Sequence, residues 1–99
     1  MKLQTQTVHV DPAPELIDFI QRKVDKLETF YDRIIDGEVF LKMENGEAIE
    51  DKIVEIKLNI PGNQLFAKEQ SDSFEKAADA AVDALRRQLK KHKEKLASH

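Results

Sequence analysis

The sequence predicts an α/β (α+β) two-layer sandwich, in the order βαβββα, with two helices packed on one face of a four-stranded sheet. Two segments, 12–31 and 74–96, repeat apolar residues at helical spacing, so each should form a helix with one apolar stripe. Four shorter segments have the residue types or the alternation of half-buried strands: 3–10, 38–44, 54–60 and 65–70. Strands and helices that are apolar on one side bury those sides by stacking as two layers.

Composition narrows the class of protein before any motif is considered. The chain has 99 residues, 40% of them hydrophobic and 35% charged, which suits a single domain spanning residues 1–99. No apolar run approaches the ~18–20 residues of a membrane span, and the first ten residues lack the apolar core of a signal peptide. The absence of cysteine excludes disulfides and thiolate metal sites. We therefore expect a cytoplasmic protein with no membrane partner.

The first helix is expected directly after the first strand. Asp11-Pro12-Ala13-Pro14 ends that strand, and Asp11 is predicted as the helix N-cap with Pro12 as the first helical residue. One stripe of the helix should face the core: Leu16, Ile20, Val24, Leu27 and Tyr31. The charges beside this stripe separate into an acidic flank and a basic flank, the latter formed by Arg22, Lys23 and Lys26.

The next two strands are separated by an acidic connection. Asp36-Gly37 is predicted as a turn before the second strand, residues 38–44. That strand should run parallel to the first if the two are neighbours, because a helix connects them. Asn45-Gly46 opens the acidic connection, which runs to Asp51 and precedes the clearly alternating third strand.

The third and fourth strands should form an antiparallel hairpin. Pro61-Gly62-Asn63 is a turn signal between them. In the fourth strand we expect Leu65 and Ala67 to face the core and Phe66 to face away from it. Phe40 occupies the corresponding outward position in the second strand.

The second helix starts after a recognisable capping sequence. Asp72-Ser73-Phe74-Glu75 resembles a capping box, with Asp72 accepting from an early helix amide and Glu75 reaching back. One face is predicted to be apolar: Phe74, Ala78, Ala81, Val82, Leu85, Leu89 and Leu96. His92 lies on the same side of the helix, so we expect it to be partly buried in packing.

The second half of this helix concentrates positive charge. Between Arg86 and Lys95 there are six Lys/Arg and one Glu, a net +5, whereas residues 1–85 carry ten Lys/Arg and eighteen Asp/Glu, a net −8. Cations at a helix C-terminus complement the macrodipole by about 0.3–1 kcal/mol each, which accounts for two or three of them. Six cations this close together repel one another by more than the dipole returns. The cluster therefore favours an external polyanion, RNA in particular.

Helical-wheel arithmetic divides these cations into two rows. One row holds Arg86, Lys90 and Lys93, and the other holds Arg87, Lys91 and Lys95. If the two helices pack side by side, the basic flank of the first helix could extend this surface. It could equally be an ordinary solvated flank.

No pattern in the sequence indicates catalysis, a metal ion or a cofactor. His9, His92 and His99 have no ligand spacing, the three glycines sit singly in turns, and no serine has a base nearby in sequence. We expect a non-enzymatic protein with no cofactor and no small-molecule substrate. The outward Phe40 and Phe66 could stack single-stranded bases, or could cover an open sheet or a partner interface.

The chain resembles a known family, the bacterial ribosome hibernation-promoting factors, also called ribosome-associated inhibitor A proteins. Two segments carry the resemblance: Lys26-Leu-Glu-Thr-Phe-Tyr-Asp-Arg-Ile34 and Asp83-Ala-Leu-Arg-Arg-Gln-Leu-Lys-Lys-His-Lys-Glu-Lys-Leu96. The similarity spans nearly the whole chain and is to a short-form member, without the C-terminal domain through which long forms pair ribosomes. It implies the same βαβββα fold.

The resemblance also implies a function and a set of contacts. A member would bind the small ribosomal subunit at the decoding centre, where messenger RNA and tRNAs bind, and would inhibit translation on idle ribosomes. It would be monomeric when free. The positions that match the family's ribosomal-RNA contacts come from both helices: Arg22, Lys23, Lys26, Arg86, Arg87, Lys90, Lys91 and Lys93. The acidic first half of the second helix, with Glu75, Asp79 and Asp83, is expected to lie away from bound phosphates.

A protein–protein adaptor is the alternative function. Its basic helix would dock an acidic partner, and its open sheet face, with Phe40 and Phe66, would pair or oligomerise. The two functions differ in a simple observable, because an adaptor keeps its partner after ribonuclease treatment and an RNA-bound factor does not.

Overall fold

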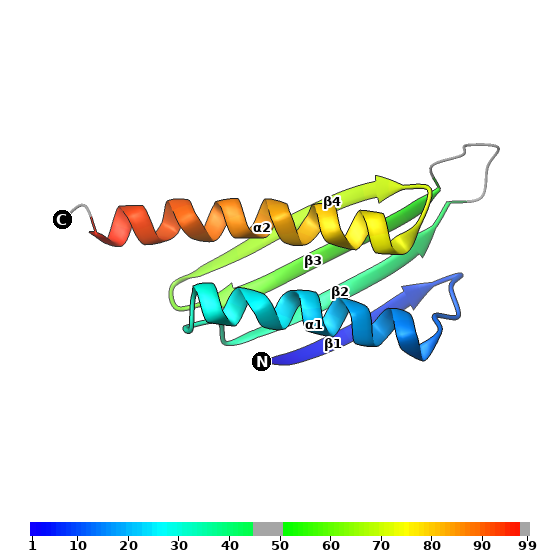
Figure 1. Cartoon of the computed structure of the whole chain (residues 1–99), viewed down its shortest axis with the longest axis horizontal. Helices are drawn as coiled ribbons and strands as arrows, with labels where there is room; N and C mark the ends of the chain where they lie inside the picture. The colour runs from blue at the N-terminus through cyan, green and yellow to red at the C-terminus, as the bar shows by residue number, and fades with distance from the viewer. Residues whose placement is uncertain (45–50, 98–99) are drawn as a thin grey trace.

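The structure is a computed structural model that describes residues 1–44 and 51–97 of the chain. Along the chain the elements are β1 (Lys2–Val8), α1 (Pro14–Phe30), β2 (Asp36–Met43), β3 (Lys52–Ile60), β4 (Asn63–Ser71) and α2 (Phe74–Ala97). The predicted order βαβββα and the α+β architecture are confirmed (Figure 1). The acidic connection predicted after the second strand falls mainly on residues 45–50, outside the described residues.

The four strands form one sheet in the order β1-β2-β3-β4. β1 runs parallel to β2, as its helical connection predicted, with Leu3 opposite Gly37. β3 is antiparallel to both β2 and β4, and Leu58 lies opposite Leu65 in the predicted hairpin. Gly62 in the hairpin turn has φ 74°, a conformation that glycine adopts without the strain a Cβ would add.

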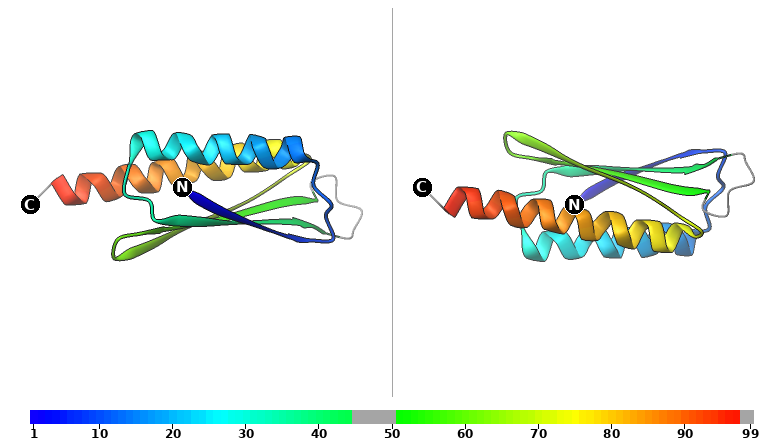
Figure 2. Two further views of the ribbon diagram at one scale, coloured as in Figure 1. Left: turned by 90° about the horizontal axis from the view of Figure 1, so that it is seen from below. Right: turned by 90° about the horizontal axis from the view of Figure 1, so that it is seen from above.

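The two helices lie side by side on one face of the sheet, and views along the sheet show a helical layer over a strand layer (Figure 2). The core lies between the layers. From α1 it takes the predicted stripe, with Leu16, Ile20, Val24 and Leu27 buried, and Tyr31 just after the helix is 7% exposed. From α2 it takes small residues as well as large ones, which let the helix approach the sheet closely: Ala77, Ala78 and Ala81 are fully buried.

Most of the strand ends differ from their predicted positions by one or two residues, and two of these differences have an identifiable origin. β1 ends at Val8 and not at Val10, because His9 adopts a left-handed conformation with φ 58° that interrupts the extended chain. β2 begins at Asp36 and includes Gly37, where the sequence suggested a turn. Gly37 is buried within the strand, so the turn prediction is wrong at this site.

α1 also begins later than the sequence suggested. Its N-cap is Ala13, no side chain caps the helix, and Pro14 is the first helical residue. Ala13 is extended, with φ −66° and ψ 147°, because the ring of a following proline clashes with a residue in the helical conformation. Pro12 therefore cannot open a helix that must pass through Ala13 and Pro14. The predicted cap at Asp11 is wrong.

α2 is capped by Ser73, one residue after the predicted cap. The hydroxyl oxygen of Ser73 accepts from the Lys76 amide at 3.2 Å, and its carbonyl accepts from the Ala77 amide at 3.1 Å. Asp72 instead pairs with the ammonium group of Lys76 at 3.2 Å. The hydrogen bond from Lys76 and its positive charge hold the pKa of Asp72 below its ordinary value. The capping role predicted for Asp72 is therefore wrong.

Two polar side chains position α2 in addition to its apolar face. Gln88 Nε2 donates to the carbonyl oxygen of Phe66 in β4 at 2.8 Å. The ring of His92 meets that of Tyr31 edge to face, with the ring centroids 5.6 Å apart. His92 is partly buried in this contact, as predicted.

No described helix covers the other face of the sheet. Phe66 is 45% exposed there, and its two chain neighbours in β4 point into the core. Phe40 in β2 lies on the same face and is partly buried. The predicted outward orientation of both phenylalanines is confirmed. Lys42 and Glu55 form an ion pair of 2.6 Å on this face, which is therefore mixed in character and not uniformly apolar.

Replacing Gly37 by alanine should destabilise the fold. The new Cβ would lie 2.9 Å from Leu58 Cδ2, 3.0 Å from Leu3 Cδ1 and 3.3 Å from the Lys57 carbonyl oxygen, and the fully buried Leu58 has no room to move away. Overpacking costs about 1–3 kcal/mol, more than the about 0.4–1 kcal/mol gained by restricting the unfolded chain. Urea unfolding of Gly37→Ala should show a lower midpoint than the parent. A urea midpoint equal to or higher than that of the parent would contradict the close packing of Gly37 against Leu58 and Leu3.

Removing the α2 cap should lower stability more than removing the neighbouring charge. Ser73→Ala should cost about 0.5–2 kcal/mol, because the Lys76 amide loses its acceptor. Asp72→Asn loses only an exposed ion pair, so its effect should be smaller. Because the pKa of Asp72 is lowered in the folded state, that smaller effect should be present at neutral pH and disappear as the pH falls below the ordinary Asp pKa. Urea titrations at neutral pH and at a pH below the ordinary pKa of Asp compare the two variants. A larger loss of stability for Asp72→Asn than for Ser73→Ala would refute the assignment of Ser73 as the cap.

Candidate nucleic-acid interface

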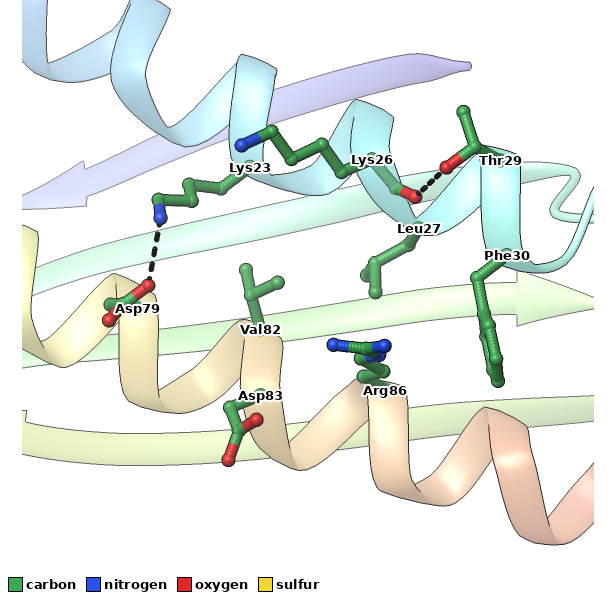
Figure 3. Close-up of a pocket in the computed structure, with 9 residues that line it drawn as sticks. All are labelled: Lys23, Lys26, Leu27, Thr29, Phe30, Asp79, Val82, Asp83 and Arg86. Atoms are coloured by element: carbon green, nitrogen blue, oxygen red, sulfur yellow. Dashed lines mark hydrogen bonds and ion pairs between the residues drawn. The ribbon is translucent and has the colours of Figure 1, made fainter.

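A groove of about 470 Å³ runs between α1 and α2. Charged, apolar and aromatic side chains from both helices line this interhelical groove (Figure 3): Lys23, Lys26, Leu27, Thr29, Phe30, Asp79, Val82, Asp83 and Arg86. Leu27 and Val82 are core residues, 2% and 9% exposed, and supply its apolar floor. The groove follows from the fold, because two helices that bury their stripes on one sheet must face each other along their flanks.

The basic flank of α1 is the flank that faces α2. Lys23 and Lys26 line the interhelical groove, since they lie on the α2 side of the buried stripe. Arg22 lies beside them and lines a neighbouring hollow together with Phe19. The Lys23 ammonium group is 5.4 Å from the centroid of the Phe19 ring, within the range of a cation–π contact. The three cations predicted on α1 are therefore contiguous with Arg86, the α2 cation that lines the groove.

The acidic flank of α1 faces away from the interhelical groove. Glu28 accepts a hydrogen bond from the N-terminal ammonium group of Met1, beside β1. This bond raises the pKa of the ammonium group above its ordinary value. Asp25, on the same flank, accepts from Gln21 Nε2 at 2.8 Å. The separation of charge seen along α1 thus corresponds to two different neighbours, β1 on one side and α2 on the other.

The two rows of cations on α2 have different surroundings. Arg86 lines the interhelical groove, and Lys93 contacts the last residue of α1. Lys90 lies within about 40° of Arg86 around the helix axis, so it belongs to the same side. Arg87 and Lys91 are turned about 100–140° away from Arg86, toward solvent, and both are exposed. The structure therefore gathers one row beside α1 and leaves the other on the outside of α2.

Two acidic residues of α2 lie among these cations. Asp79 pairs with Lys23 across the interhelical groove at 3.0 Å, and Asp83 pairs with Arg87 at 3.0 Å within α2 (Figure 3 draws the first pair). Both carboxylates line the groove. The sequence predicted that the acidic half of this helix lies away from bound phosphates. In the structure, the packing of α1 against it places two of its carboxylates in the interhelical groove. The Asp83–Arg87 pair is exposed and the Lys23–Asp79 pair is partly exposed, so their partners remain exchangeable.

Phe30 occupies a central place that its sequence position did not reveal. The Lys93 ammonium group lies 4.5 Å from the centroid of its ring and donates to its carbonyl oxygen at 2.9 Å. The guanidinium carbon of Arg86 lies 5.6 Å from the same centroid. Phe30 is the last residue of α1, where helix carbonyls lack an internal partner, so Lys93 also completes this helix end. The sequence held one signal for this role of Phe30: it lies four residues after Lys26 and therefore on the same side of the helix.

α2 extends past the sheet and past the end of α1 (Figure 1, orange to red). Its 24 residues make it about 36 Å long, and its C-terminal turns have no strand beneath them. Leu96, which lies on the predicted apolar face, is 52% exposed for this reason. Lys90, Lys91 and Lys93 lie on the last two to three turns. Among the described residues, no carboxylate pairs with Lys90 or Lys91, so both can accept an external anion.

Other kinds of site find little support in the described part of the chain. Residues 1–44 and 51–97 contain no group of three or more His, Asp or Glu side chains placed to hold a metal ion. Neither α1 nor α2, over its described length, has an apolar stretch that could cross a membrane. The candidate site in the described residues is therefore the interhelical groove together with the basic end of α2.

Comparison with known proteins relates the chain to proteins of the ribosome. A family model described as sigma 54 modulation protein / S30EA ribosomal protein matches residues 3–97. A ribosome hibernation promoting factor of Klebsiella oxytoca is 35% identical over 99 residues, which is 100% of both chains. Another from Pseudomonas putida is 36% identical over 95 residues, covering 96% of this chain and 89% of the relative.

Two solved structures are also similar to this chain. A ribosomal subunit interface protein from Coxiella burnetii matches with a TM-score of 0.85 at 26% identity, covering 95% of this chain and 99% of that one. The N-terminal domain of Thermus thermophilus Protein Y shares the fold, with a TM-score of 0.80 at 22% identity, covering 93% and 99% of the two chains. The resemblance to the ribosome hibernation-promoting factors is confirmed, and this chain belongs to their family, the sigma 54 modulation and S30EA ribosomal proteins.

Proposed function

We propose that this protein is a ribosome hibernation factor that binds the small ribosomal subunit at the decoding centre, blocks the messenger RNA and tRNA sites and inhibits translation. The names of its relatives support a role in ribosome hibernation. The observation that carries the mode of binding is the convergence of cations from two helices around one groove and one projecting helix end. Such a surface suits the phosphate backbone of folded RNA.

The proposed contacts with ribosomal RNA are the eight basic residues predicted from the sequence: Arg22, Lys23, Lys26, Arg86, Arg87, Lys90, Lys91 and Lys93. Lys90 and Lys91 lie on the projecting turns of α2, where phosphates can approach from several sides. Lys23 and Arg87 each hold a carboxylate in the free protein, so they would exchange that exposed partner for a phosphate. Phosphate contacts supply affinity, and the shape of the two-helix ridge would select the site.

In this proposal the protein acts by occupancy alone. No bond is made or broken and no cofactor takes part, so inhibition should be reversible and proportional to the fraction of small subunits bound. The protein would act in the cytoplasm, as a monomer when it is not on the ribosome.

One observation favours the adaptor as a second candidate. Phe66 is 45% exposed on the uncovered sheet face, and Phe40 lies on the same face, two strands away in β2. A protein partner docked there would be retained after ribonuclease treatment of a pull-down. Loss of all captured material after ribonuclease would instead support RNA as the ligand.

Neutralising cations on α2 should weaken ribosome binding and reduce its dependence on salt. In the variant Arg86→Gln, Lys90→Gln, Lys91→Gln, three phosphate contacts are lost, and each contributes about 0.7–0.9 to the slope of log affinity against log salt. The slope should therefore fall by about 2–3, measured by pelleting with small subunits at several salt concentrations. The matched control removes the same charge from the opposite face of the sheet: Lys2→Gln, Lys57→Gln, Lys68→Gln. Equal slopes for the two variants would count against the proposal.

Ribosomes that already hold messenger RNA and tRNA should bind the protein much less than vacant ribosomes, because the proposed site is the channel these ligands fill. Sedimentation of the protein with vacant and with programmed ribosomes, at one salt concentration, measures the difference. Adding the protein first should likewise reduce the binding of labelled tRNA. Equal binding to both kinds of ribosome would place the site elsewhere.

A further inference from the structure

Phe30 lies between two adjoining hollows of the helical layer. On one side is the interhelical groove of about 470 Å³. On the other is a hollow of about 540 Å³ whose lining includes Lys93 and Leu96. Thr29 and Phe30 line both. Each volume is within the range of about 300–1,000 Å³ that small-ligand sites occupy. The aromatic ring is thus a partition that a ligand in either hollow would meet.

Each hollow also presents a cation to this ring. Arg86 belongs to the interhelical groove, with its guanidinium carbon 5.6 Å from the ring centroid, and Lys93 belongs to the second hollow, 4.5 Å from it. In Figure 3 the side chains of Phe30 and Arg86 reach into the groove from opposite helices. An aromatic face beside Arg or Lys is the arrangement with which proteins hold unpaired bases, because the ring stacks on the base and the cation binds the adjacent phosphate.

We propose that Phe30, with Arg86 and Lys93, is a stacking site for one unpaired nucleotide of single-stranded RNA. The base packs against the Phe30 ring above the apolar floor of the groove, and its phosphate lies between the two cations. This inference deepens the proposed function, on which it rests, by naming a base contact in addition to the phosphate contacts. Phe30 is not among the residues predicted to bind RNA, and it carries no charge.

The charges of the groove would orient the nucleotide. Asp79 and Asp83 line the groove toward the N-terminal half of α2 and repel a phosphate there, whereas Arg86 and Lys93 attract it at the Phe30 end. The base, which is neutral, can extend from the Phe30 end over Val82 toward these carboxylates. A donor on the edge of the base, such as the N3–H of uracil, could then donate to them.

A purely structural role for Phe30 accounts for less of what is observed. Lys93 donates to the backbone carbonyl of Phe30. This bond does not require the phenyl ring, because every residue has a backbone carbonyl. Tyr31, the next residue, is buried at 7% exposure and already supplies an aromatic anchor for the end of α1. Phe30 in contrast is only partly buried, at the rim of two hollows, and so remains accessible to a ligand.

A tryptophan at position 30 reports directly on stacking. The chain has no tryptophan, so Phe30→Trp creates a single tryptophan, which can be excited selectively, at the proposed site. Its fluorescence should be quenched when a short oligouridylate binds and should stay unchanged with inorganic polyphosphate, a polyanion that has no bases. Equal responses to the two ligands would overturn the proposal.

Affinity measurements on Phe30→Leu and Phe30→Tyr provide the second test. Loss of one stacked base, about 1–3 kcal/mol, corresponds to an about 5–150-fold weaker binding of oligouridylate by Phe30→Leu. Phe30→Tyr should keep the parent affinity, and polyphosphate should bind all three proteins equally, with an unchanged salt slope. The control Lys90→Gln should instead weaken both ligands and lower the slope. Oligouridylate binding that is unchanged in Phe30→Leu, with parental thermal stability, would overturn the proposal, as would an equal loss with both ligands.

These outcomes are separable from those of the proposed function. If the parent protein sediments with small subunits but Phe30→Leu binds oligouridylate normally, the stacking site is refuted and ribosome binding stands. If the parent does not sediment with small subunits but Phe30→Leu loses oligouridylate selectively, the stacking site stands and the ribosomal function is refuted.

Discussion

Both helices must bury their apolar stripes on the same face of one four-stranded sheet, and the remaining features of the surface depend on that constraint. Because the stripes of α1 and α2 point down into the core, a flank of each helix is forced to face a flank of the other. The fully buried alanines of α2 bring its first half close to the sheet and set its height relative to α1. The interhelical groove, its apolar floor and the cations on its walls follow from this packing and need no loop to form them.

The electrostatics of the molecule are local, although the chain as a whole is acidic with a net charge of −3. Negative charge on α1 is turned toward β1, where Glu28 meets the N-terminal ammonium group, and positive charge is turned toward α2. Asp79 and Asp83 moderate the groove by pairing with Lys23 and Arg87. These exposed pairs hold the cations weakly. These carboxylates weaken the attraction of the groove for polyanions in general. A ligand that also makes contacts other than phosphate contacts is therefore favoured over a simple polyanion.

The end of α1 combines a structural role with the proposed ligand contact in one place. Lys93 completes the helix by donating to the carbonyl of Phe30, and the same ammonium group lies over the ring of that residue. Next to it, Tyr31 holds His92 edge to face and so anchors the point where α2 leaves the sheet. The projecting turns of α2 are therefore fixed in direction at their base while their basic side chains stand clear of the sheet. A projection held in one direction would lose little entropy on binding RNA in the way proposed above.

The sequence by itself determined the type and order of every element and the inward face of all of them except β1, because helical and strand periodicities are local properties that a short window contains. It also located the cation-rich end of α2, since charge density needs no fold to be counted. Tertiary structure alone decided which flanks meet, that Asp79 and Asp83 enter the groove, that Phe30 divides two hollows and that Leu96 has no sheet to cover. It also decided that Gly37 is a close approach to Leu3 and Leu58. Each of these depends on the approach of segments distant in the chain, and residue periodicity holds no information about such distances.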